Sequence, residues 1–143
     1  MTIAAGFAAA LTLLVQTPLT AWTWTLYENT GAVVLAHEVP DTAQLRATLE
    51  CEPGSGAVEV VLYEFGAVAE FARLRAGPAT ATSEAEQGAN RSIRVGLRID
   101  HPGFAAFASS GRLTVSSGER SATVTVDRAN LAKLRRFGEL CAG

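Results

Sequence analysis

The feature that most constrains the fold is a series of short segments in which apolar and polar residues alternate. In the clearest of them, arginine and glycine residues alternate with Ile93, Val95, Leu97 and Ile99. Successive side chains of a β-strand point to opposite faces, so this pattern predicts strands with one buried face. The same pattern, interrupted by turn residues such as Asn29 and Gly31, recurs at 22–27, 32–38, 45–51 and 58–62.

Residues 66–90 depart from this pattern. Apolar residues at helical spacing in 68–74 predict either a short helix or an irregular strand, whereas 79–87 alternates small residues with threonine and glutamate, which predicts an exposed edge strand. Further along the chain, Pro102 favours the start of a short helix that ends at Gly111.

The last predicted element is a helix over residues 130–141, with Asp127 as its N-cap. Its apolar stripe consists of Leu131, Leu134, Phe137 and Cys141. The basic residues between them fall off the stripe, which is typical of a solvated face. The predicted fold class is therefore α+β: a mostly antiparallel β-sandwich or curled sheet, capped by a C-terminal helix.

The chain has two cysteines, Cys51 on the apolar face of a predicted strand and Cys141 on the apolar stripe of the last helix. Neither belongs to the Cys-x-x-Cys pair of thioredoxin or zinc sites. An even pair predicts a disulfide in an oxidising compartment, and a loop of about 90 residues gives it roughly 4–5 kcal/mol in the chain-entropy model. Two buried free thiols, or a bond to a partner, are the alternatives.

Residues 1–21 carry no charge. Within them, the apolar run 3–15 has the length of a signal-peptide hydrophobic region and is shorter than the roughly 20 residues of a membrane span. Pro18 ends the run, and Ala21 offers a small residue for cleavage. We expect a signal peptide at 1–21 and a single β-rich domain at 22–143, periplasmic or secreted and without a membrane span after cleavage. A buried N-terminal helix and a retained membrane tether are the alternatives.

Composition and motifs exclude several function classes. Twelve lysines and arginines against 14 aspartates and glutamates give a net charge of −2, which argues against a nucleic-acid binder. The two histidines, His37 and His101, lie in no zinc-binding or catalytic-triad spacing, and Gly54-Ser55-Gly56 lacks the lysine of a phosphate-binding loop. We expect no cofactor and no metal.

Two groups of residues are candidates for binding. Arg94 and Arg98 share the outward face of one predicted strand, and with Arg112 they could form a surface that attracts anions. Trp22 and Trp24 belong either to the core, which is the default, or to an aromatic binding surface.

A series of positions carries a resemblance to known proteins: Leu45-x-x-x-Leu49-x-Cys51, Gly54-Ser55-Gly56, a valine strand, Phe104 to Phe107, Ser110-Gly111-Arg112-Leu113-x-Val115, and a Leu/Phe helix ending at Cys141. With these positions the chain resembles small exported bacterial proteins of unassigned function. More loosely, it is similar to periplasmic accessory proteins of type VI secretion, whose central aromatic–Asp strand motif it lacks. Neither resemblance implies catalytic residues.

The sequence therefore favours an exported, noncatalytic binding or accessory protein stabilised by one disulfide. Its expected partner is an envelope protein or another ligand that contacts a sheet face or edge. The alternative function is a small periplasmic hydrolase that uses His37 or His101, but no nucleophile–base pair is visible in the sequence.

Overall fold

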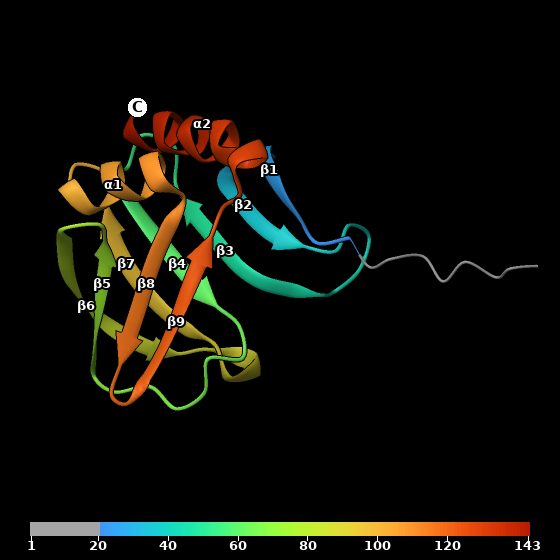
Figure 1. Ribbon diagram of the computed structural model, residues 1–143. Helices are drawn as coiled ribbons and strands as arrows, with labels where there is room; N and C mark the ends of the chain where they lie inside the picture. The colour runs from blue at the N-terminus through green and yellow to red at the C-terminus, as the bar shows by residue number, and fades with distance from the viewer. Residues whose placement is uncertain (1–20) are drawn as a thin grey trace, which may run out of the picture.

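In a computed structural model of the protein, residues 21–143 are the part that is described, so the predicted signal peptide lies outside the described residues except for Ala21. Within this range the chain forms nine strands, two α-helices and two single 3-10 turns (Figure 1). The strands are β1 (Thr23–Thr30), β2 (Ala32–Glu38), β3 (Leu45–Cys51), β4 (Ala57–Leu62), β5 (Phe71–Ala76), β6 (Ala79–Gln87), β7 (Ile93–Arg98), β8 (Arg112–Ser117) and β9 (Arg120–Thr125). The helices are α1 (Pro102–Ser110) and α2 (Leu131–Ala142), and the 3-10 turns are η1 (Ala89–Arg91) and η2 (Arg128–Asn130).

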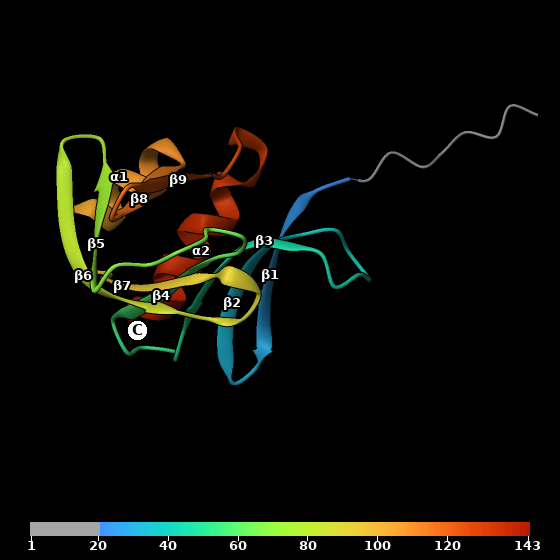
Figure 2. The same ribbon diagram turned by 90° about the horizontal axis from the view of Figure 1, so that it is seen from below.

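The strands form one antiparallel sheet in the order β1-β2-β3-β4-β7-β6-β5-β8-β9. The sheet curls into an open barrel, and both helices lie at the same end of it (Figures 1 and 2). Strand β6 joins the two halves of the sheet, since residues 79–84 pair with β5 and residues 85–87 pair with β7. The predicted α+β class, a curled sheet with a C-terminal helix, is confirmed.

For residues 66–90, the structure settles one alternative, helix or strand, and shows that one expectation, an edge strand at 79–87, is wrong. The segment whose apolar residues have helical spacing contains strand β5, in which Ala72, Leu74 and Ala76 face the core while Phe71 is exposed. Strand β6 is not at an edge but lies between β7 and β5. Its outward residues are exposed and its inward residues only half-buried, which explains why its sequence is as polar as that of an edge strand.

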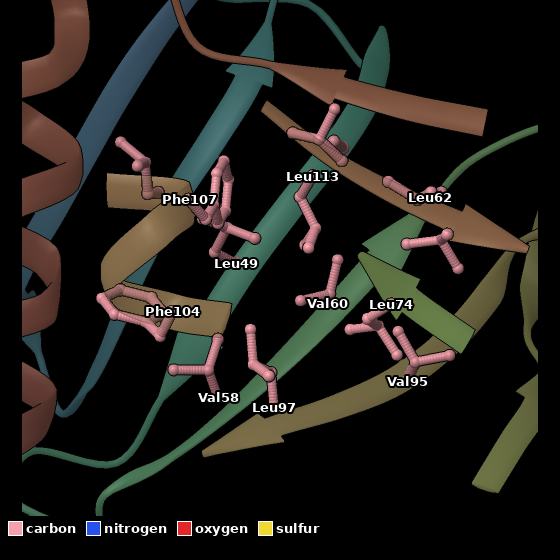
Figure 3. Close-up of a cluster of buried hydrophobic side chains, with 14 of the residues drawn as sticks. Leu49, Val58, Val60, Leu62, Leu74, Val95, Leu97, Phe104, Phe107 and Leu113 are labelled. Atoms are coloured by element: carbon pink, nitrogen blue, oxygen red, sulfur yellow. The ribbon is translucent and has the colours of Figure 1, made fainter. Parts of the chain in front are cut away.

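The core fills the inside of the barrel. Figure 3 shows side chains from both halves of the sheet and from α1 pointing toward one another. Those labelled are Leu49, Val58, Val60, Leu62, Leu74, Val95, Leu97, Phe104, Phe107 and Leu113. All are buried, and burying such a side chain contributes about 1.5–3 kcal/mol, so this interior dominates the stability of the fold.

Helix α1 begins and ends as the sequence predicts, with one addition. Pro102 occupies the first turn, and Gly111 ends the helix in the left-handed conformation at φ 76°. The addition is His101, whose Nδ1 accepts a hydrogen bond from the Gly103 N–H at 2.9 Å and so caps the helix. Asp127 differs from its prediction: its carboxylate accepts from the Asn130 side-chain amide, and a 3-10 turn precedes α2.

Helix α2 is held to the sheet by a disulfide and by two backbone hydrogen bonds. Cys51 of β3 is bonded to Cys141, with the Cα atoms 5.9 Å apart and both residues buried, so the predicted disulfide is present. The turn after β3 donates from Gly54 N–H to the Leu140 C=O and from Gly56 N–H to the Cys141 C=O, at 3.0 and 2.9 Å. These bonds satisfy carbonyl groups that a helix C-terminus otherwise leaves without a partner.

The other end of α2 contacts strand β1. Lys133 Nζ donates to the Trp24 C=O at 2.6 Å, and Arg136 pairs with Glu28 at 3.5 Å. Two of the basic residues predicted to be only solvated, Lys133 and Arg136, therefore also attach the helix to the edge of the sheet.

Candidate functional site

The sheet does not close, because β1 and β9 stand at the two ends of the strand order and do not pair with each other. Directly after β9, the Val126 N–H donates to the Gly111 C=O, which precedes β8. Even-numbered residues here therefore direct their backbone groups toward β8. Backbone groups alternate between the two sides of a strand, so Ser121, Thr123 and Thr125 direct their N–H and C=O groups away from β8. Only Thr125 has a partner there among the described residues: its C=O accepts from Trp24 Nε1 at 3.2 Å. Ser121 and Thr123 therefore present a free strand edge.

Aromatic rings stack beside this edge. The His37 ring lies parallel to the Trp24 indole, with centroids 4.7 Å apart, and is tilted against Trp22 at 5.5 Å. The Arg46 guanidinium lies over the Trp22 ring, 3.9 Å from its centroid, at the distance of a cation–π contact. Trp24 is buried whereas Trp22 and His37 are half-buried, so Trp22, placed by the sequence either in the core or on a surface, lies between the two.

Two cavities adjoin along this seam. One, of about 280 Å³, lies between β9 and the inner face of β1 to β4 and is lined by Trp24, His37, Arg46, Tyr63 and Thr123 among others. The other, of about 860 Å³, shares Arg46 and Tyr63 with the first and extends past Trp22 to η1. The two cavities adjoin at Arg46 and Tyr63 and are together called the seam groove below.

The far end of the seam groove is built on unusual backbone. Glu64, Asn90 and Arg91 all have φ near 55°, in the left-handed region that residues other than glycine rarely adopt. Two hydrogen bonds hold them together, from Glu64 N–H to the Asn90 C=O at 3.3 Å and from Gly66 N–H to the Arg91 C=O at 3.0 Å. Such backbone costs about 1–3 kcal/mol per residue and is concentrated at functional sites.

The charges of the seam groove favour an anionic group. Arg46 and Arg91 line it and take part in none of the ion pairs formed within residues 21–143, whereas Glu64 is the single acidic residue in the lining. Burial lowers the pKa of His37, the positive charge of Arg46 lowers it further, and Asp127 partly opposes the shift. At neutral pH His37 is therefore an uncharged aromatic wall of the groove.

The geometry gives the hydrolase alternative no support. His37 contacts aromatic rings, and His101 Nδ1 is engaged as the cap of α1. In the described part of the chain, neither ring forms a hydrogen bond with a hydroxyl or a carboxylate, which a nucleophile–base pair requires. Histidine, cysteine, aspartate and glutamate residues also form no group of three or more that could hold a metal ion in residues 21–143.

The three arginines predicted to attract anions do not lie together. Arg94 pairs with Glu59 and Arg98 with Asp100, both at 3.0 Å, on strand β7. Arg112 lies on β8, with β6 and β5 between it and β7. The structure thus separates Arg112 from the other two.

Several residues of the seam groove had no signal in the sequence. Arg46 and Tyr63 are neighbours because β3 pairs with β4, with Tyr63 N–H donating to the Arg46 C=O at 3.0 Å, and backbone hydrogen bonds between the turn after β4 and η1 bring Arg91 to them. The sequence around Asn90 predicts a turn, but nothing in it predicts a left-handed pair next to a tryptophan.

Comparison of the chain with known protein families, with curated proteins and with solved structures gave no match. The resemblance to exported bacterial proteins therefore stays a prediction. Neither helix of the described chain has both the length and the apolar character needed to cross a membrane.

Proposed function

We propose that the protein is an exported, noncatalytic binding module that holds an extended segment of a partner polypeptide in the seam groove. The observation that carries this proposal is the free edge of β9 at Ser121 and Thr123, next to the rings of Trp24 and His37. The partner is an envelope or extracellular protein, since the buried disulfide fits an oxidising compartment.

Strand addition is the mode of binding that this edge favours. An extended segment paired with β9 forms main-chain hydrogen bonds with the free N–H and C=O groups of Ser121 and Thr123, and its alternate side chains point into the seam groove. Proteins usually protect such edges with charged residues, proline or a bulge. After Arg120, whose guanidinium is directed toward the Phe65 C=O, residues 121–126 contain only serine, alanine, threonine and valine, so this part of the β9 edge has neither charge nor proline.

The walls of the groove specify the side chains of the partner. The half-buried ring of His37, held by stacking on the buried Trp24, favours an apolar or aromatic side chain opposite β9. Arg46 and Arg91 favour an aspartate or glutamate further along the segment, because a carboxylate bonded to a guanidinium forms a strong, charge-assisted hydrogen bond.

A peptide library displayed on phage, selected on the oxidised protein, tests the proposal. We expect enrichment of uncharged β-forming residues followed by an acidic residue. Binding of a selected peptide is then measured from the change in tryptophan fluorescence, which the contacts of Trp22 and Trp24 with the groove make sensitive to occupancy.

The variant Thr123→Pro removes the outward N–H without removing a bond to β8, and Thr123→Val is its matched control, since it keeps the N–H. We expect Thr123→Pro to weaken binding about tenfold, as the loss of one hydrogen bond does, and Thr123→Val to bind nearly as the parent does. Unchanged melting temperatures establish that both variants are folded. If no peptide is enriched, or if the selected peptides bind Thr123→Pro as tightly as the parent, strand addition at β9 is wrong.

A further inference from the structure

A second surface stands out on the outer face of the half-sheet formed by β5, β8 and β9. Arg73 and Arg75 are exposed on β5 at alternate positions, so their Cβ atoms lie on one face, roughly 7 Å apart. Arg75 faces Thr114 across the β5–β8 pair, and Arg112 precedes Thr114 by two residues on the same face. Arg112 is thus a diagonal neighbour of Arg75, roughly 7–8 Å away.

None of these three arginines forms an ion pair within residues 21–143, although Glu84, opposite Phe71 on β6, is a diagonal neighbour of Arg73. The four ion pairs found in the described part of the chain involve Arg94, Arg98 and Arg136 only. Neighbouring like charges repel one another, which disfavours the arrangement in the absence of a ligand. An anion placed among the guanidinium groups removes this repulsion and forms charge-assisted hydrogen bonds.

Hydroxyl groups surround the arginines. The Thr114 and Thr123 hydroxyls lie 3.1 Å apart across β8 and β9, and Ser116 Oγ donates to Ser121 Oγ at 3.2 Å. Thr82 of β6 faces Arg73 across the other side of β5. These hydroxyl groups offer both donors and acceptors to a polar ligand that lies flat on the sheet.

An exposed aromatic ring completes the surface. Phe71 is 51% exposed, and it lies on the same face as Arg73 and Arg75. It lines a shallow cavity of about 410 Å³ together with Arg73, Arg75, Thr82, Thr114 and Ser116. We call Phe71, Arg73, Arg75 and Arg112, with these hydroxyl residues, the arginine–hydroxyl face.

We infer that the arginine–hydroxyl face binds an acidic polysaccharide, a chain of sugar rings that carry carboxylate or sulfate groups. The arginines pair with the anionic groups, the threonines and serines bond to sugar hydroxyls, and the Phe71 ring packs against the apolar face of a sugar ring. This combination fits a sugar better than a lipid surface, because the face has a single large apolar side chain and membrane-surface binding needs several. It also fits better than single-stranded nucleic acid, because binding of successive bases uses several stacking aromatic rings and this face has only Phe71.

The arginines and Phe71 of this second site are separate from the seam groove, which lies along the inner face of β1 to β4. Ser121 and Thr123 of β9 adjoin both surfaces, because their hydroxyls face Ser116 and Thr114 while their outward backbone groups face the seam groove. A ligand held by Arg73, Arg75 and Phe71 leaves the seam groove accessible as long as it does not extend onto β9.

Affinity electrophoresis and calorimetry with three polymers test the inference: polygalacturonate, dextran sulfate and neutral dextran. We expect the protein to bind polygalacturonate, dextran sulfate or both, with an affinity that falls as salt rises, and to leave neutral dextran unbound. Comparison of the two acidic polymers distinguishes carboxylate from sulfate recognition. Binding to neither, or equal binding to neutral dextran, overturns the inference.

The double variant Arg73→Gln/Arg75→Gln has a matched control in Arg94→Gln/Arg98→Gln, which removes the same charge from exposed arginines that already have acidic partners. We expect the first to weaken binding at least about tenfold and the control to weaken it less than about twofold. Equal loss in both means that net charge alone drives binding, and the site is then not on this face.

The variant Phe71→Ala separates recognition of a sugar from attraction of any polyanion. We expect it to weaken polysaccharide binding about two- to tenfold while the salt dependence stays the same, because the charges are untouched. No change on Phe71→Ala, or tighter binding to single-stranded DNA or to phosphatidylglycerol vesicles than to either acidic polysaccharide, overturns the inference.

Discussion

Breaking the Cys51–Cys141 bond is expected to remove a large share of the stability of the domain. The bond closes a loop with a sequence separation of 90 residues, and the chain-entropy model assigns to such a loop about 4–5 kcal/mol at 25 °C. Small domains have total free energies of unfolding of about 5–15 kcal/mol. The reduced protein is thus expected to unfold at a much lower denaturant concentration than the oxidised one.

Urea unfolding followed by tryptophan fluorescence measures this difference, since Trp24 is buried and reports the loss of the core. Both sulfurs are buried, so the protein is reduced while unfolded and then refolded in the presence of reductant. Reduction leaves the side chains in place, whereas the variant Cys51→Ala/Cys141→Ala also removes buried volume. The variant is therefore expected to lose as much stability as the reduced parent, and somewhat more.

Hydrogen exchange locates the effect. Without the disulfide, we expect the amides in the last turn of α2 to exchange faster than those in β3. The end of the helix is then attached to the turn after β3 by two hydrogen bonds, from Gly54 and Gly56, and no longer by a covalent bond. Equal unfolding midpoints for the oxidised and reduced protein would refute the reasoning. That result would mean that side-chain packing and the hydrogen bonds of α2 hold the helix without any contribution from the disulfide.

Four further predictions concern single positions. Gly111→Ala is expected to lower the melting temperature strongly, because a Cβ at φ 76° would overlap the Val126 carbonyl oxygen; a melting temperature within a degree or two of the parent, roughly the effect of a neutral surface change, contradicts this. Phe137→Ala is expected to cost about 3–5 kcal/mol in urea unfolding, since Phe137 is fully buried, and a loss near zero would show that α2 does not pack as described. The pKa of His37 is held below its ordinary value of 6.5, so the unfolded chain binds this proton more readily; stability should fall as the pH drops below about 6.5, and His37→Gln should flatten that slope. N-terminal sequencing of the exported protein is expected to begin at Trp22, whereas a start at Met1 would favour the retained tether.

The sequence predicts the strands best where alternation is clean. Segments 32–38 and 45–51 coincide with β2 and β3, because each has one face in the core and few exceptions to the period of two. Strand β5 is ambiguous because its inward face is built from alanines and one leucine, while its largest apolar residue, Phe71, faces solvent. The helical spacing of 68–74 counted Phe71 as a buried residue, whereas in β5 it faces solvent.

The candidate sites depend on contacts that local pattern does not encode. Trp22, Trp24 and His37 attract attention as residue types, but their position beside β9 follows from the curl of the whole sheet. Likewise Arg112 was grouped with Arg94, yet the strand order places it beside Arg75. Both cases require the order of the strands, which nine short segments with similar composition do not specify.

The position of Cys51 on the third strand has a consequence for biogenesis. If the chain is exported from its N-terminus, as we propose, Cys51 emerges well before Cys141, and for the intervening 90 residues the first thiol has no native partner. During that interval it is open to pairing with thiols of other chains or with an oxidoreductase. We expect maturation to depend on a catalyst that shields or exchanges this early thiol until the last helix arrives.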